Sequence, residues 1–211
     1  LLQYETQRLI LKVLGPDYSN DVLILFRDRE LFEQYEATRS PNFYTETHQR
    51  TILQLEYGLT LKLSQVRFYV FLKEAPEKII GTVCLYDISS SSSRAEIGYK
   101  FSSEYHHMGY ATEAVEKLID IAFSELNLHR LCAHVQENNV PSIRLLVGLG
   151  FEKEGLCRDF LCLNGTWTDH LQYSLIVPNL QFKFTNQQPK VPSFASWFFS
   201  FFEKVTDLFI S

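Results

Sequence analysis

The sequence contains 211 residues, of which 45% are hydrophobic and 21% are charged, and its formal net charge is −5. This length is enough for one domain with a sizeable core, alone or with an appendage. The acidic balance argues against nonspecific binding to nucleic acid, because proteins of that kind cluster lysine and arginine against phosphates.

The cysteines indicate a reducing compartment. Cys84, Cys132, Cys157 and Cys162 form no C-x-x-C pair, and this spacing favours reduced thiols. The sequence has no basic start followed by an apolar run, so we expect no secretory signal. It also has no apolar stretch long enough to span a bilayer. We therefore expect a cytoplasmic protein without an integral membrane segment.

Residue patterns predict the elements of the first half. Residues 8–14 are expected to form a strand, which Pro16 and Asp17 end before a helical region that reaches residue 26. A second helix is expected over 47–65, where Ile52, Leu55, Leu59 and Leu63 recur at helical intervals. Three strands follow, and the serine run between the last two predicts a hairpin. The strands are expected at 67–73, 78–88 and 94–101.

The second half alternates helices with strands. A helix with one apolar stripe begins near Gly109 and runs to about residue 126, between strands 94–101 and 129–136. Such a crossover should be right-handed and should make its two strands parallel. A further helix is expected after Asn139, and two strands then close the domain around the turn Asn164–Gly165.

The composition changes after residue 178. Residues 179–192 read as a linker, and 193–211 read as an amphipathic helix rich in phenylalanine. An apolar face of this kind needs cover. It could cap a groove of its own domain, pack against a second subunit in a homodimer, or lie in a membrane surface. We favour protein contact, because helices on membrane surfaces usually carry a polar face rich in lysine and arginine.

The start of the helix near Gly109 has unusually small residues. The segment HHMGYA covers residues 106–111. A small residue can simply let the chain turn. It can also leave the first N–H groups of the helix bare, and these groups together with the helix dipole bind phosphate.

Four segments, in order, resemble the GNAT superfamily of acyl-CoA-dependent N-acetyltransferases, specifically its RimJ/RimL-like branch. They are ETQRLILKVL (5–14), AEIGYKFSSEYHHMGYATEAV (95–115), ENNVPSIRLLVGLGF (137–151) and NGTWTDHLQYSLI (164–176). The resemblance implies an α/β (α+β) fold with a mixed, mostly antiparallel sheet of about seven strands flanked by helices. The acetyltransferase domain would occupy residues 1–178.

The resemblance also implies how acetyl-CoA would be held, and it implies no metal. The family's phosphate-binding loop, Gln/Arg-x-x-Gly-x-Gly/Ala, corresponds to residues 106–111, but His106 and Met108 replace the usual amide or basic residues, so we expect weaker binding than in relatives. The thioester would lie between strands 95–101 and 131–136, which splay apart. The residues expected to bind the cofactor are Ile97, Gly98, Tyr99, His106, His107, Met108, Gly109, Tyr110, Ala111, Thr112, Asn139 and Ser142.

Two residues are candidates for the chemistry. By the resemblance, Glu96 is the first candidate for the general base; otherwise it pairs with a cation or faces solvent. The tyrosine that serves many relatives as general acid corresponds to Leu146, and Ser142 is the proposed substitute; otherwise its hydroxyl bonds the backbone of the first helical turn. Asn139 would bond the pantetheine or cap its helix. The backbone N–H of Ile97 or Gly98 is the expected oxyanion donor.

Two functions follow from these features. The first is transfer of an acetyl group to a primary amine, either a protein N-terminus or a small amine, by direct attack in a ternary complex. Acceptor choice would depend on residues 26–64 and on the hairpin at Asn164. The second is a non-catalytic acyl-CoA-binding or protein-interaction module, for which the altered loop, Leu146 and the tail leave room.

Overall fold

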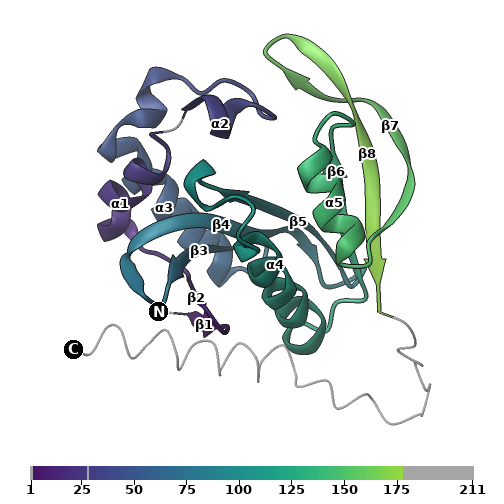
Figure 1. The fold of residues 1–211 in the computed structure, drawn as a ribbon, viewed down its shortest axis with the longest axis horizontal. Helices are drawn as coiled ribbons and strands as arrows, with labels where there is room; N and C mark the ends of the chain where they lie inside the picture. The colour runs from purple at the N-terminus through teal and green to yellow at the C-terminus, as the bar shows by residue number, and fades with distance from the viewer. Residues whose placement is uncertain (1, 28, 178–211) are drawn as a thin grey trace.

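The computed structural model describes residues 2–27 and 29–177, and within these residues the strands form one eight-stranded sheet (Figure 1). The strand order is β1-β2-β3-β4-β5-β6-β8-β7, and only the β5–β6 pair is parallel. The predicted mixed, mostly antiparallel sheet is confirmed, with one more strand than the seven expected. The predicted linker and C-terminal helix lie outside the described residues.

The observed elements follow the predicted order. The strands are β1 (Gln3–Glu5), β2 (Leu9–Lys12), β3 (Val66–Leu72), β4 (Ala75–Ser89), β5 (Arg94–Phe101), β6 (Arg130–Val135), β7 (Glu152–Leu163) and β8 (Thr166–Ile176). The helices are α1 (Ser19–Leu25), α2 (Arg29–Glu33), α3 (Glu46–Leu61), α4 (Tyr110–Asp120) and α5 (Val140–Gly148). A π-helical turn, Ile121–Glu125, extends α4.

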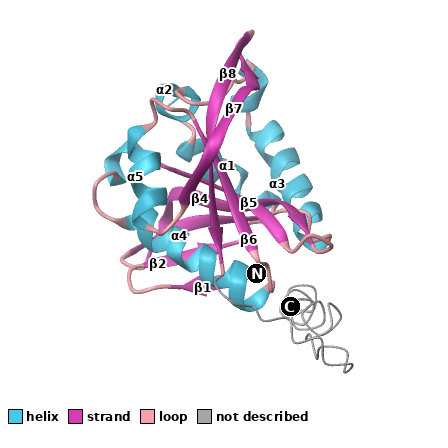
Figure 2. Cartoon of the chain, turned by 90° about the vertical axis from the view of Figure 1, so that its right-hand side faces the viewer, coloured by secondary structure: helices cyan, strands magenta, loops and turns pink. Residues whose placement is uncertain are grey.

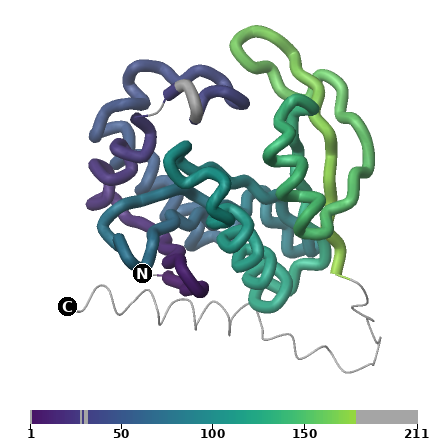
Figure 3. Tube along the Cα trace, in the orientation of Figure 1, coloured from purple at the N-terminus to yellow at the C-terminus, as the bar shows by residue number. Residues whose placement is uncertain are grey.

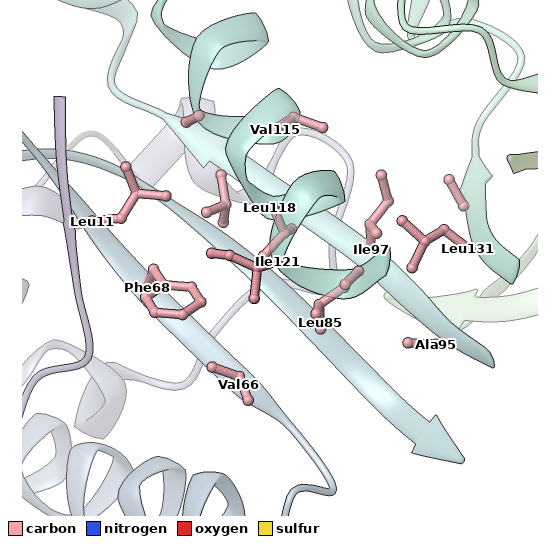
Figure 4. Close-up of a cluster of buried hydrophobic side chains, with 14 of the residues drawn as sticks. Leu11, Val66, Phe68, Leu85, Ala95, Ile97, Val115, Leu118, Ile121 and Leu131 are labelled. Atoms are coloured by element: carbon pink, nitrogen blue, oxygen red, sulfur yellow. The ribbon is translucent and has the colours of Figure 1, made fainter. Parts of the chain in front are cut away.

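Helices cover both faces of the sheet. Figure 2 shows α4 and α5 on one side of the strands and α3 on the other. Beneath α4, the buried side chains of Val115, Leu118 and Ile121 pack over the strands, where Phe68 and Leu85 lie (Figure 4). Burying one such aliphatic side chain stabilises the fold by about 1.5–3 kcal/mol. The start of α4 is therefore anchored on the sheet.

The predicted helix 47–65 is observed as α3, but its leucine pattern does not mark the core. Leu55 is 63% exposed and Leu59 is 37% exposed. Glu56 instead meets the sheet, where it accepts hydrogen bonds from Arg67 Nε at 2.6 Å and from the Tyr69 hydroxyl at 2.9 Å. The residues that the helix buries are Gln49, Leu53 and Thr60. Beside them, Glu56 gives the partly buried guanidinium of Arg67 a carboxylate partner.

The crossover from β5 through α4 to β6 makes these two strands parallel, as predicted. Their pairing covers only Arg94↔Arg130, Ala95↔Leu131 and Glu96↔Cys132. Beyond Glu96, β5 continues with β4 as its partner, and β6 continues with β8. Within the described residues, no helix combines the length and the apolar character needed to cross a bilayer.

Candidate active site

The sheet opens where β5 and β6 stop pairing. Residues 97–101 remain paired with β4 but have no partner strand on the side of β6. Five residues of strand span about 16 Å. This divergence matches the predicted splay of 95–101 and 131–136. It leaves a length of strand edge, including Ile97, Gly98 and Tyr99, that can accept an extended ligand as an added strand.

The loop after β5 folds back onto the end of that strand. His106 Nε2 donates a hydrogen bond to the backbone oxygen of Phe101 at 3.0 Å. Gly109, the N-cap of α4, has a φ of 79°, which favours glycine, and no side chain caps the helix. The predicted phosphate residues, from His106 to Thr112, therefore occupy an exposed loop and a bare helix start beside the open strand edge.

A cation that the sequence did not reveal lies at this loop. Arg8 Nη1 donates to the backbone oxygen of Met108 at 3.0 Å, and its guanidinium covers the Tyr110 ring at 4.4 Å. Arg8 Nε also forms an ion pair with Glu113 at 2.7 Å. The loop thus has a basic neighbour although positions 106 and 108 lack one. The residues of the loop itself gave no signal for a partner from the N-terminal segment, because Arg8 lies about 100 residues away in the chain.

A shallow depression of about 690 Å³ borders the helix start from the flank facing residues 5–8. It includes Gly109, but its charged side chains are Glu5, Glu113, Glu116 and Asp120 against Arg8 and Lys117. This excess of carboxylates disfavours an anion. We therefore expect a phosphate on the side of the loop that faces β5.

Glu96 projects from the last residue pair before the strands diverge. Its Oε2 lies 3.0 Å from His134 Nδ1, and the Tyr86 hydroxyl also bonds the carboxylate. Gly98 makes room for Tyr86, because a Cβ there would lie 3.2 Å from Tyr86 Cε1. The hydrogen bond from His134 lowers the pKa of Glu96, although burial opposes this. The carboxylate is therefore ionised at neutral pH and accepts hydrogen bonds only.

His134 is a candidate site residue that the sequence analysis did not single out, because a lone histidine in a strand carries no motif. Its ring stacks on Phe160 with centroids 4.2 Å apart and planes inclined by 20°. Phe160 follows Asp159, which has a φ of 48° at a bulge in β7 and donates its N–H to Asp169 Oδ1 at 2.8 Å. Asp169, which lies in the predicted closing hairpin, thus helps to shape the strand that carries Phe160.

Asn139, the predicted helix cap, and Ser142, the predicted general acid, lie at the start of α5, which follows β6. Asn139 Oδ1 accepts a hydrogen bond from the Ser142 N–H at 3.3 Å, so the capping alternative for Asn139 is confirmed. Within the described residues, the Ser142 hydroxyl bonds the Tyr99 hydroxyl at 2.7 Å and no backbone group. Burial raises the pKa of Tyr99 to about 12, so this phenol stays protonated. Leu146 is buried in the core.

The two regions expected to choose the acceptor meet in space. Thr38, which follows α2, donates its N–H to Asn164 Oδ1 at the tip of the β7–β8 hairpin at 2.8 Å. In Figure 3 the segment after α2 and the tip of the β7–β8 hairpin approach each other at the top of the molecule. Glu36 from the same segment forms an ion pair with Lys100 on β5. The segment after α2 thus contacts both the tip of the hairpin and the far end of β5.

None of the four cysteines forms a disulfide. All four cysteines are free, with Cys84 and Cys132 buried. Burial raises the pKa of Cys84 to about 11, which keeps it a thiol. Among residues 2–27 and 29–177, no group of three or more His, Cys, Asp or Glu side chains is placed to hold a metal ion.

Comparison with known proteins identifies this arrangement. The acetyltransferase (GNAT) domain family matches residues 8–152. An uncharacterized N-acetyltransferase, p20 of Bacillus licheniformis, is 36% identical over 172 residues, which cover 81% of this chain and 94% of that protein. Ribosomal-protein-S5-alanine acetyltransferase of Vibrio fischeri is 30% identical with a TM-score of 0.77, covering 83% of this chain and 97% of that one.

A third comparison includes a ligand. RimJ of Mycobacterium smegmatis, in complex with CoA-disulfide, has a TM-score of 0.74 at 23% identity and covers 82% of this chain and 84% of that one. At this identity the likeness concerns the fold alone. From its family match and these relatives, the chain belongs to the GNAT family of N-acetyltransferases, in the RimJ/RimL-like branch.

Proposed function

We propose that this protein transfers the acetyl group of acetyl-CoA to a primary amine, by direct attack in a ternary complex. The observation that carries the proposal is the opening between β5 and β6, which leads to the bare start of α4. The open edge of β5 suits the extended pantetheine arm of the cofactor, and the bare start of α4 suits its diphosphate. The RimJ protein with the same fold is described in complex with a CoA derivative, which supports the choice of cofactor.

Each predicted cofactor residue has a role in this proposal. The diphosphate would lie on residues 106–112, and the pantetheine arm would pair with the edge of 97–101. A backbone N–H at Ile97 or Gly98 would donate to the oxyanion formed from the thioester carbonyl. Asn139 and Ser142 would approach the arm from α5, on the far side of the opening.

The acid and the base would come from two hydrogen-bonded pairs, each of which joins β5 to the β6–α5 side. Glu96 and its partner His134 supply the groups that can take a proton from the ammonium of the acceptor. Ser142, bonded to the protonated phenol of Tyr99, would deliver a proton to the leaving thiolate. The two pairs flank the place where β5 and β6 part, so a thioester there would lie within reach of both.

The acceptor is proposed to be a protein N-terminus or a small amine, in the cytoplasm. The Vibrio fischeri relative is named for acetylating an alanine of a ribosomal protein, which favours a protein N-terminus. The carboxylates of Glu36 and Glu96 on the acceptor side suit a cation. The four free cysteines agree with a reducing compartment.

Binding of coenzyme A tests the cofactor half of the proposal. Calorimetry should detect binding to the wild-type protein and a loss of about tenfold or more in Gly109→Val, because a side chain there blocks the anion and strains a left-handed backbone. Gly58→Val is the matched control, since a Cβ at Gly58 meets nothing within 4 Å. Absence of binding to the wild type would refute the proposal.

Thiol release from acetyl-CoA tests the transfer itself. The acceptors are spermidine, alanine amide and a peptide that begins with alanine. We expect release with at least one amine and an acetylated product of matching mass. Binding of coenzyme A without release by any of the three would favour the alternative, a non-catalytic acyl-CoA-binding module.

A further inference from the structure

We propose that the proton of the acceptor ammonium passes to His134 Nε2, and that Glu96 is the positioning residue that holds this imidazole in the reactive tautomer. This inference rests on the proposed acetyl transfer and names the atom that performs one step of it. It also assigns a role to a histidine that the sequence analysis did not single out.

The hydrogen bond between the two residues decides the tautomer. Glu96 Oε2 and His134 Nδ1 are 3.0 Å apart. An ionised carboxylate can only accept, so the hydrogen must reside on Nδ1. A neutral imidazole protonated at Nδ1 carries its lone pair on Nε2. The pair therefore leaves the more distant ring nitrogen as the free proton acceptor.

The surroundings keep Nε2 available. Within the described residues, the only hydrogen bond or ion pair of His134 is the one that Nδ1 makes with Glu96. Nε2 makes no hydrogen bond there, and it is not among the fully buried polar atoms that lack a partner, so it keeps some solvent exposure. The side chain is 11% exposed, and stacking on Phe160 fixes the ring plane. A fixed ring with one free, accessible nitrogen is the arrangement that general-base catalysis requires.

The neighbouring groups favour the imidazole over the carboxylate as the base. The pKa of Glu96 is lowered by the hydrogen bond from His134, so Glu96 binds a proton only under acidic conditions. The imidazole, by contrast, offers the lone pair of Nε2, which no neighbouring group in the described residues occupies. The charged or titratable neighbours are Tyr86 from β4, Arg94 from β5 and His170 from β8. Glu96 stabilises the imidazolium, while Arg94 and a protonated His170 would oppose it.

Every bond and proton of the proposed acetyl transfer can be followed. The N–H bond of the acceptor ammonium breaks, and its proton joins His134 Nε2. The free amine attacks the thioester carbon, the new C–N bond forms, and the C–S bond breaks. The leaving thiolate takes a proton from the Ser142 hydroxyl and becomes the thiol of coenzyme A. The second proton that the amine nitrogen loses as the amide forms returns to Ser142, directly or through water. The imidazolium then returns its proton to solvent, so one proton is released for each acetyl group transferred.

The tautomer is measured first, because it needs no acceptor. The full-length protein is labelled with nitrogen-15 histidine, and His134 is assigned from the spectrum of His134→Asn. We expect a protonated Nδ1 and an unprotonated Nε2 at about pH 8, and a population of the other tautomer in Glu96→Gln. A neutral His134 protonated on Nε2 in the wild type would overturn the inference, whatever the outcome of the transfer assay.

The pH–rate profile is the second measurement, with spermidine and the alanine peptide as acceptors. His134→Asn keeps an amide that can donate to Glu96 but cannot titrate. We expect a fall in kcat of about 100-fold or more, loss of the rise in rate near neutral pH, and an unchanged KM for acetyl-CoA. An unaltered rise in that variant would assign the proton to another group.

His129→Asn is the matched control on the same segment, since its buried Nδ1 has no hydrogen bond among the described residues. It should retain the wild-type profile. If the wild-type protein releases no thiol with either acceptor, the proposed function fails. The tautomer measurement then decides the assignment of His134 by itself.

Discussion

At the scale of single residues, Glu113 links the N-terminal segment to residues 106–112, the proposed phosphate-binding loop. Its carboxylate accepts hydrogen bonds from Thr6 Oγ1 at 2.5 Å and from the backbone N–H and Nε of Arg8, both at 2.7 Å. Arg8 in turn holds the backbone of Met108. Burial pushes the pKa of Glu113 upward, but these hydrogen bonds outweigh it and the pKa is lowered. A carboxylate in the first turn also suits the helix dipole.

We expect Glu113→Gln to lower the free energy of unfolding by about 1–3 kcal/mol near neutral pH, because charged hydrogen bonds are lost. The folded-state pKa lies below the ordinary value of 4.5. This stabilisation is therefore complete above that value and disappears as the pH falls through the lowered one. Urea unfolding of the wild type and the variant should show their difference shrinking below about pH 4.

The control for this experiment is Glu104→Gln. Glu104 pairs with Lys78 at the surface, and its side chain is 65% exposed. Exposed pairs of this kind contribute about 0–1 kcal/mol. Equal losses in the two variants, or a loss in Glu113→Gln that ignores pH, would contradict the role given to Glu113.

At the scale of elements, the pairing of β4 with β5 supports the open strand edge, and it depends on one missing side chain. Gly81 pairs with Phe101 near the end of β5. A Cβ at Gly81 would lie 2.5 Å from the backbone oxygen of Lys100 and 2.5 Å from Cδ1 of Phe101. The close approach of the two strands at this point therefore requires glycine.

We expect Gly81→Ala to destabilise the protein by about 1–3 kcal/mol, since the strands must separate to admit the methyl group. For a chain of this length, that corresponds to a fall in Tm of about 2–12 °C. Differential scanning calorimetry measures it. Gly155→Ala in β7 is the control, because nothing lies within 4 Å of a Cβ there. A wild-type Tm in Gly81→Ala would show that β4 and β5 adjust freely.

At the scale of the whole molecule, one hydrogen bond joins parts that are far apart in the chain. The Thr38 N–H bonds Asn164 Oδ1. Asn164 also adopts a left-handed φ of 52° in the hairpin turn. Asn164→Gly keeps a residue that tolerates this backbone but removes the acceptor for Thr38. The substitution therefore separates the link across the molecule from the turn itself.

We expect the Thr38 amide to exchange about 3- to 10-fold faster with deuterium in Asn164→Gly, in proportion to a lost hydrogen bond of about 1 kcal/mol. The control is Asn127→Gly, because Asn127 has the same φ of 52° and makes no side-chain hydrogen bond within the described residues. Unchanged exchange at Thr38 in Asn164→Gly would mean that this hydrogen bond does not hold the segment after α2 against the hairpin.

The sequence by itself determined the order of the elements, the serine hairpin, the parallel crossover and the bare helix start at Gly109. These features depend on residues that are neighbours in the chain, so periodicity and turn residues reveal them. The resemblance to a known family rests on the same local segments, and from them Glu96, Ser142 and the loop were proposed as site residues.

Only the tertiary structure decided which side chains are partners. The exposure of Leu55, the pairing of Glu96 with His134 and the approach of Arg8 to the phosphate loop each depend on strand register or on contacts between distant segments. One residue of register moves a side chain to the other face of a sheet. Local patterns do not record such long-range geometry. For this reason the sequence indicated Glu96 as a candidate, and only the fold revealed its partner His134.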